Sequence, residues 1–184
     1  MDSRLIAKEN FGKLIRAKRK IEQKTGTRLN LVNGELFIEG TEINIFAANK
    51  IIDAIERDFE ISIALLLGDP EYILEDLHIK DFTRKKDMKR VRGRIIGQKG
   101  RTIELLGELS DCHVVLNDNT ISIIGTAEKM KDAINAARSL IQGAKQANVY
   151  TYLELARKRQ YPGNLALKKN NKEVTESEES EEAN

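Results

Sequence analysis

Apolar residues in the first part of the chain alternate in two short stretches and recur at helical spacing just before them. The alternating stretches predict strands over residues 27–32 and 35–39, because every second side chain of a strand points to the same face. Between them lies Asn33-Gly34, a dipeptide that favours a type I′ turn, so we expect a hairpin. The helical spacing predicts a helix over 16–24.

The second half of the chain predicts the same series of elements. The further elements expected in the two halves are strands over 3–6 and 73–79, helices over 43–59, 101–109 and 127–142, and strands over 113–116 and 120–124 around Asn117-Asp118-Asn119. A short helix is also expected ahead of the helices at 16–24 and 101–109. Each half therefore runs strand, helix, helix, strand, strand, helix.

The two halves are copies of one unit, related by a constant offset of 85 residues, as position 97 is to position 12. The identities that share this offset without a gap are Gly12, Arg16, Leu31, Ile38, Gly40, Thr41 and Ala48, which recur as Gly97, Arg101, Leu116, Ile123, Gly125, Thr126 and Ala133. A register of this length without insertion is not expected by chance. The sequence thus predicts a tandem repeat.

Gly68-Asp69-Pro70 interrupts the helical pattern between the two copies. We expect a first domain over residues 1–70 and a second over 71–160. The expected fold class is α+β, with two tandem domains packed against each other.

A last helix is predicted over 149–159, closing the second domain before Pro162-Gly163. The acidic segment 161–184 is expected to be disordered, because it has few apolar residues to bury. From position 168 onward, three lysines face six glutamates, so the preceding part of the chain carries a net charge of +5 within a total of +2.

The composition excludes several classes of protein. Hydrophobic residues make up 40% of the chain, enough for a core, yet no apolar run approaches the roughly 20 residues of a membrane helix. One cysteine, Cys112, excludes an internal disulfide framework, and only two histidines accompany it, so we expect no metal and no cofactor. The first four residues lack the layout of a secretory signal, so we expect a soluble, cytoplasmic protein without membrane contact.

Basic residues gather around a glycine-containing stretch in the second half. Residues 84–101 hold nine Lys and Arg against one acid, Asp87. A patch this compact is typical of a surface that faces nucleic acid, and a solvated charged face is the competing interpretation.

The glycines of this stretch predict a phosphate-binding loop. Gly97 and Gly100 let the backbone turn tightly and approach a ligand, and the next helix directs the positive end of its dipole at the loop. The spacing fits neither a Walker loop nor G-x-G-x-x-G; it is the GxxG of a KH domain, which clamps about four single-stranded nucleotides. The residues expected to bind RNA are Gly97, Gln98, Lys99, Gly100, Arg101, Arg94, Ile95, Ile96, Arg92 and Arg90.

The low aromatic content favours a KH domain over other RNA-binding modules. Aromatic residues make up 5% of the chain and Trp is absent, whereas RRM and many OB-fold proteins stack bases on exposed aromatic rings. A KH groove can instead hold bases against aliphatic side chains, and Ile95, Ile96, Leu105 and Val114 are candidates for it. Ordinary core packing is the competing interpretation, and the stronger one for Leu105.

The first copy departs from this pattern at the loop. Ile15 stands where the second copy has Gly100, and a β-branched residue does not accept the same tight backbone path. We therefore expect the first unit to serve as a packing partner or protein-binding surface. Its basic run at 16–20 is interpreted as a solvated helix face.

Three features together resemble a known family: the run Lys89–Gly97, the partner copy with a degenerate loop, and the segment 143–159 with Val149-Tyr150. The family is the archaeal Partner-of-Nob (Dim-two) KH proteins of small-subunit ribosome assembly. The resemblance implies tandem type I KH domains, the second of which holds single-stranded RNA near the 3′ end of 16S rRNA. It also implies three partners: a Nob-type endonuclease, a dimethyladenosine transferase and the alpha subunit of initiation factor two.

Two positions depart from the family pattern. Gly107 interrupts the helix after the loop, at a cost of about 1 kcal/mol relative to Ala. Asp111 stands where a helix-ending glycine is common, whereas Gly26 fills the equivalent place in the first copy. We expect local softening and an intact loop.

Three alternatives to rRNA binding stay open at this stage. The first is a general mRNA- or exosome-associated KH protein. The second is an enzyme, which the dispersed Asp76, Asp81 and Asp87 do not favour, nor do Cys112 and His113, whose adjacent side chains would point to opposite faces of a strand. The third is a protein scaffold with a vestigial loop.

Overall fold

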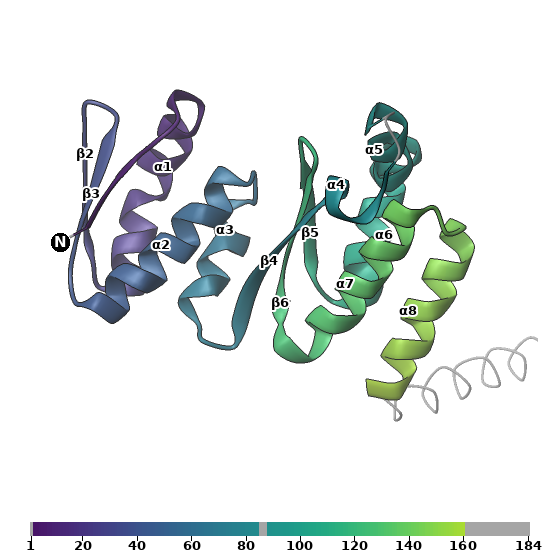
Figure 1. Cartoon of the computed structure of the whole chain (residues 1–184). Helices are drawn as coiled ribbons and strands as arrows, with labels where there is room; N and C mark the ends of the chain where they lie inside the picture. The colour runs from purple at the N-terminus through teal and green to yellow at the C-terminus, as the bar shows by residue number, and fades with distance from the viewer. Residues whose placement is uncertain (1, 85–87, 161–184) are drawn as a thin grey trace, which may run out of the picture.

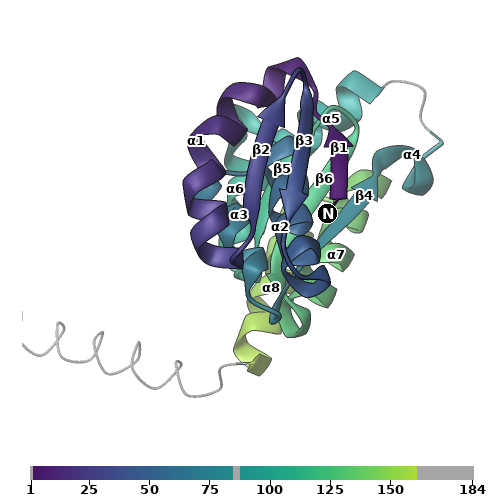
Figure 2. The same cartoon turned by 90° about the vertical axis from the view of Figure 1, so that its left-hand side faces the viewer.

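The computed structural model describes residues 2–84 and 88–160 and stacks them in four layers: sheet, helices, sheet, helices. Figure 1 shows these layers from one side. In Figure 2 the stack is viewed end on, and the first sheet lies in front of the second. The two copies of the repeat are therefore placed one behind the other.

The N-terminal unit, defined here as residues 2–68, is a three-stranded antiparallel sheet with helices on one face. Its elements are β1 (Asp2–Leu5), α1 (Lys8–Thr25), β2 (Arg28–Val32), β3 (Glu35–Glu39), α2 (Glu42–Glu56), α3 (Ile61–Ala64) and the 3₁₀ turn η1 (Leu65–Gly68). The strand order is β1-β3-β2, and the predicted hairpin turn has positive φ at both Asn33 and Gly34.

The main difference from expectation in this unit concerns its first helix, whereas α2 ends at Glu56 instead of at 59 and β1 lies one residue earlier than expected. The two helices expected between β1 and β2 form one continuous helix, α1. The reason is local: Ile15 lies within α1 at the place where the second unit has Gly100, so nothing breaks the helix there.

The C-terminal unit, defined here as residues 72–160, repeats the antiparallel sheet with strand order β4-β6-β5. Its elements are β4 (Tyr72–His78), α4 (Ile79–Phe82), α5 (Met88–Ile96), the 3₁₀ turn η2 (Gln98–Gly100), α6 (Arg101–Ser110), β5 (His113–Asn117), β6 (Thr120–Thr126), α7 (Ala127–Gln142) and α8 (Gln146–Gln160). The bounds of α7 agree with the prediction, and the last helix begins at Gln146 rather than at 149. The acidic segment 161–184 lies outside the described residues.

The sheet of the C-terminal unit is covered on both faces. On one face, Ile121 and Ile123 of β6 belong to the core formed with α6 and α7. On the opposite face, Leu74 and Ile124 contact the core of the N-terminal unit. Because successive strand residues point to opposite faces, β6 is buried on both, through Ile123 on one face and through Ser122 and Ile124 on the other. The two domains are packed against each other, as the sequence predicts.

Polar contacts accompany this apolar interface. Arg57, which caps the C-terminus of α2, binds Asp76 of β4, and Asn117 at the end of β5 donates to the carboxylate of Asp58 at 2.7 Å. Asp58 also pairs with Lys13 of α1. These contacts fix the direction in which β4 and β5 lie against the N-terminal helices.

Two searches of the described ranges bear on the function. Within residues 2–84 and 88–160, no helix is both long enough and apolar enough to cross a bilayer. In the same ranges, no group of three or more His, Cys, Asp or Glu side chains is placed to hold a metal ion.

Candidate nucleic-acid interface

The predicted loop breaks the helix between α5 and α6. Gly97 has φ +76° and ψ −177°, Gly100 has φ +83°, and Lys99 between them has φ +53°. A Cβ atom at Gly97 would lie 2.0 Å from Oγ1 of Thr102, whereas one at Gly100 would meet open space. Gly97 is therefore required by both its conformation and its neighbour, and Gly100 by its conformation alone.

The backbone amides of this loop are used in part within it. Gly97 donates to Gly93 O at 2.9 Å, Gly100 donates weakly to Gly97 O at 3.4 Å, and Arg101 donates to Gln98 O. The N-cap of α6 is Gly100, which supplies no side-chain cap, so the N–H groups of the first turn of α6 point at the loop without one. The amides available to an anion are thus at the start of α6 rather than at the glycines.

The two cations of the loop differ in their surroundings. Lys99 is exposed at the turn itself. Arg101 is exposed as well, but its guanidinium lies 3.0 Å from a carboxylate oxygen of Glu104 and 3.8 Å from one of Glu108. The hydrogen bond to Glu104 raises the pKa of Arg101. Lys99 is therefore the cation that the loop directs most freely toward solvent.

The arginines expected to support the loop lie on α5, as predicted, but two of them bind backbone carbonyls. Arg94 donates to the carbonyl oxygen of Ala144, in the segment between α7 and α8. Arg92 reaches the carbonyl oxygen of Asp118, in the β5–β6 turn, at 3.4 Å. Arg90 is exposed. In this arrangement the guanidinium of Arg94 binds the backbone at Ala144 and supports the loop from the protein interior, and it does not face a ligand.

The isoleucines before the loop divide between core and surface. Ile95 is fully buried in the core of the C-terminal unit, beside Val91, so the expectation that it contacts RNA is corrected. Ile96 is 40% exposed and stays a candidate for contact with a base. The reason is helical geometry: neighbouring residues on α5 lie on different faces.

A groove of about 200 Å³ lies between α6 and β5; it begins at Ile103, three residues after the loop, and no loop residue lines it. Val114, one of the predicted groove residues, lines it, and Leu105 does not. The complete lining is Ile103, Glu104 and Gly107 from α6, Cys112, His113, Val114 and Val115 from the β5 side, and Phe59 and Ile63 from the N-terminal unit. Burial raises the pKa of the Cys112 thiol, so this thiol stays uncharged at neutral pH.

Several groove residues were not predicted. Gly107 lies four positions after Ile103 and three after Glu104, and that spacing places it beside both of them on one face of α6. The spacing was therefore a usable signal. Phe59 and Ile63 come from the other unit, and no local pattern in the sequence could have placed them in the groove.

Gly107 has a structural reason. A Cβ atom there would lie 2.9 Å from the carbonyl oxygen of Cys112, because the chain folds back against α6 at this point. Asp111 takes the left-handed conformation at the C-cap of α6, with φ +52°, in the role that Gly26 plays after α1. The two departures from the family pattern thus belong to one tight turn.

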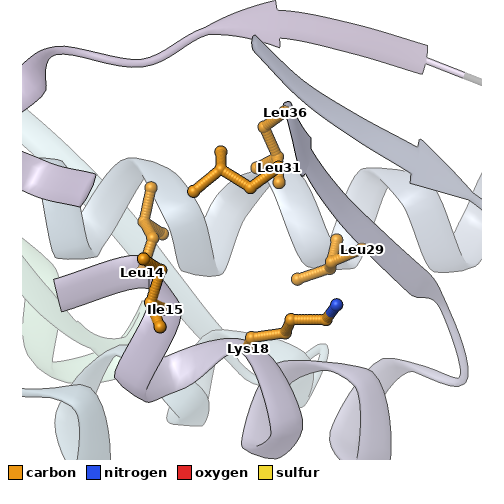
Figure 3. Close-up of a pocket in the computed structure, with 6 residues that line it drawn as sticks. All are labelled: Leu14, Ile15, Lys18, Leu29, Leu31 and Leu36. Atoms are coloured by element: carbon orange, nitrogen blue, oxygen red, sulfur yellow. The ribbon is translucent and has the colours of Figure 1, made fainter. Parts of the chain in front are cut away.

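At the equivalent place the N-terminal unit holds a much smaller cavity. Leu14 and Ile15 lie at the positions of Lys99 and Gly100, on the unbroken helix α1. Figure 3 shows side chains from α1, β2 and β3 gathered at the corresponding place, around a cavity of only about 20 Å³. Its lining is Leu14, Ile15, Lys18, Leu29, Leu31 and Leu36. A nucleobase does not fit this space.

Comparisons with known proteins agree with this geometry. A family profile described as the eukaryotic-type KH domain (KH-domain type I) matches residues 73–158. The chain is 31% identical over 182 residues to KH domain-containing protein MJ0443 of Methanocaldococcus jannaschii, covering 93% of this chain and 80% of that protein. It is 37% identical over 105 residues to pre-rRNA-processing protein pno1 of Schizosaccharomyces pombe, covering 56% of this chain and 43% of that protein.

A solved structure extends the likeness across both units. The crystal structure of the a/eIF2alpha-aDim2p-rRNA complex from Pyrococcus horikoshii matches with a TM-score of 0.76 at 31% identity, covering 86% of this chain and 94% of that chain. The match includes the packing of one unit against the other, because a single domain would cover about half of the chain. The chain belongs to the Pno1/Dim2 family of KH-domain proteins.

Proposed function

We propose that the C-terminal unit binds single-stranded RNA and that the protein holds the 3′-end region of 16S rRNA while the small ribosomal subunit matures. The observation that carries this proposal is the loop Gly97–Gly100, which separates α5 from α6 and leaves the start of α6 without a side-chain cap, while the groove lies farther along α6. The N-terminal unit has an unbroken helix at the same place. The related pno1 is named a pre-rRNA-processing protein, and aDim2p was crystallised in a complex with rRNA.

The geometry suggests how the strand is held. A phosphate lies at the start of α6, where backbone N–H groups, the helix dipole and Lys99 act together. The bases enter the groove and pack against Ile103 and Val114, and the exposed Ile96, which precedes the loop and does not line the groove, contacts a further base. In this proposal, sequence preference comes from the shape of the groove and its polar edge rather than from aromatic stacking.

The role that we propose is non-catalytic: the protein presents RNA to an enzyme that acts on it. Its proposed partners are the initiation factor two alpha subunit, which is named in the solved complex, a Nob-type endonuclease and a dimethyladenosine transferase. The proposed domains are residues 1–70 and 71–160, and the proposed location is the cytoplasm. Metal-dependent RNA cleavage by the purified protein would contradict the non-catalytic role.

Fluorescence anisotropy with a labelled single strand from the 3′ end of 16S rRNA tests the loop. Gly100→Asp places a negative charge where the phosphate is expected and should weaken binding about tenfold. Gly100→Asn is the matched control for backbone strain, because Asn has a similar size and tolerates positive φ. Ile15→Asp is the control for charge, since it places the same carboxylate at the equivalent position of the N-terminal unit.

The result expected is a large loss for Gly100→Asp, a smaller loss for Gly100→Asn and no change for Ile15→Asp. Equal losses for Gly100→Asp and Ile15→Asp would show that the loop is not the binding site. Binding to the rRNA strand should also exceed binding to an unrelated single strand at the same salt concentration. Equal affinities would instead favour a general mRNA- or exosome-associated protein.

A further inference from the structure

A polar cluster lies beneath the GxxG loop, at the point where α8 begins. Gln146, the first residue of α8, donates through Nε2 to the carbonyl oxygen of Arg94 at 3.1 Å and to Oγ1 of Thr102 at 2.8 Å. Arg94 belongs to the last turn of α5, and Thr102 belongs to the first turn of α6. A single side-chain amide therefore contacts both sides of the loop.

Each acceptor needs this partner for a physical reason. The carbonyl of Arg94 is among the last carbonyls of α5, and because the chain turns away at Gly97, no next turn of helix supplies a donor. Thr102 is 3% exposed, so its hydroxyl is shielded from water and would be costly to leave unpaired. Gln146 satisfies both groups.

Thr102 also supports the loop directly. The closest approach to a Cβ atom built on Gly97 comes from Oγ1 of Thr102, which shows that this hydroxyl lies against the Gly97 backbone. Arg94 completes the cluster in the other direction, since its guanidinium donates to the carbonyl of Ala144, two residues before Gln146. Hydrogen bonds donated by Gln146 and by Arg94 therefore join the loop to the start of α8.

The cluster is anchored and is specific to the unit that has the loop. Val149 and Leu153 of α8 are buried in the core of the C-terminal unit, so Gln146 projects from a firmly packed helix. The positions 85 residues earlier than Thr102 and Gln146 are Ala17 and Ile61, which carry no polar side-chain atoms. Where the helix is continuous, the polar cluster is missing as well.

We propose that Gln146 is a positioning residue for the RNA-binding loop: it fixes the separation of α5 and α6, so that α8 sets the geometry in which the loop receives a phosphate. This inference rests on the proposed function of the loop. Helix α8, which follows the repeated elements, thereby supports RNA binding without touching the RNA.

The test uses the full chain and the variant Gln146→Met, which keeps length and helix propensity and removes both hydrogen bonds. We expect RNA affinity to fall about five- to tenfold, because loss of both hydrogen bonds loosens the loop. Native-state hydrogen exchange at the amides of residues 99–102 should become faster relative to amides in the middle of α7. Gln142→Met, at an exposed position of the last turn of α7, is the matched control and should change neither measurement.

A double-mutant cycle with Thr102→Val separates positioning from general destabilisation. If Gln146 acts through Thr102, the loss of RNA affinity in the double variant should be smaller than the two single losses combined. Additive losses, unchanged loop exchange in a folded Gln146→Met variant, or equal acceleration throughout the unit would each overturn the inference. Hydrogen exchange needs no RNA, so if the wild-type protein fails to bind RNA, the proposed function falls while the role of Gln146 is still decided.

Discussion

Arg57 forms a salt bridge with Asp76 across the boundary between the two units. Nε of Arg57 donates to the two carboxylate oxygens at 2.8 and 3.0 Å, and a terminal guanidinium nitrogen lies 2.7 Å from Oδ2. Ser122 of β6 donates to the same carboxylate at 2.6 Å. Burial raises the pKa of Asp76, but the hydrogen bonds from Arg57 and Ser122 outweigh it, so the pKa lies below its ordinary value.

This contact predicts a pH dependence of stability. Because the pKa of Asp76 is lower in the folded state, its contribution is complete above the unfolded pKa of about 4 and is lost as the pH falls through the folded value. Asp76→Asn should therefore be less stable than wild type by about 1 kcal/mol at pH 7, and the gap should narrow below about pH 4. Urea unfolding between pH 7 and pH 3 measures it, with Asp81→Asn, an exposed aspartate, as the control. A gap that stays constant over this range would contradict the assignment.

The repeat offers a matched pair of glycines with opposite expected effects. Gly12 lies in α1, where an added Cβ meets nothing within 4 Å, so Gly12→Ala should stabilise the protein by up to about 1 kcal/mol. Gly97→Ala places a Cβ against Thr102 at positive φ. We expect this variant to lose about 2–3 kcal/mol of unfolding free energy and to lose RNA binding as well. Thermal unfolding of both variants checks the signs. Equal stabilisation would mean that the loop is helical.

Gly107 gives a second case in which helix propensity predicts the wrong sign. Propensity alone favours Gly107→Ala, but the carbonyl of Cys112 lies 2.9 Å from the new Cβ, so we expect destabilisation by about 1–2 kcal/mol. Gly93→Ala in α5 has open space and should stabilise the protein. Chemical unfolding of the two variants compares them directly, and a gain for Gly107→Ala would show that the turn after α6 is not as tight as described.

Lys99 should contribute one phosphate contact to RNA binding. Lys99→Gln is then expected to reduce the salt dependence of binding, lowering the slope of log Kd against log salt concentration by about 0.7. Lys20→Gln, at an exposed position of α1, is the control and should leave the slope unchanged. Titrations at four or five salt concentrations measure both, and equal slopes for wild type and Lys99→Gln would remove Lys99 from the contact.

The two isoleucines ahead of the loop should respond differently to truncation. Ile95→Ala empties a fully buried position and should cost about 2–4 kcal/mol of unfolding free energy. Ile96→Ala, at a 40% exposed position, should cost less than about 1 kcal/mol while weakening RNA binding several-fold. Measuring unfolding free energy and RNA affinity on both variants distinguishes a role in the core from a contact with RNA. If Ile96→Ala binds RNA as wild type does, Ile96 makes no contact with RNA.

The parts of the fold that depend on neighbouring residues could be predicted from the sequence. Asn33-Gly34 forms its turn because positive φ is a local property, and the loop at Gly97 and Gly100 forms for the same reason. The single helix α1 was missed, although Ile15 already indicated that the loop was degenerate. The missing step was that a helix without a breaker continues.

The parts that depend on distant residues could not be predicted. Arg94 was assigned to RNA from its charge and place on α5, but its partner, Ala144, lies 50 residues away. Gln146 and Phe59 belong to the site through contacts of the same kind, which no periodicity or motif records. Charge and spacing single out the loop as a candidate, and packing decides which of its neighbours face solvent.

The β4-β6-β5 sheet lies between two helical layers, and this position limits how the chain can be divided. A fragment that starts at Tyr72 would leave Leu74, Val115 and Ile124 bare on one side of the sheet and would remove Phe59 from the groove wall. Such a fragment would self-associate in water. The N-terminal unit therefore serves as the cover of one face of this sheet, and a substitution at the interface has to fit both units.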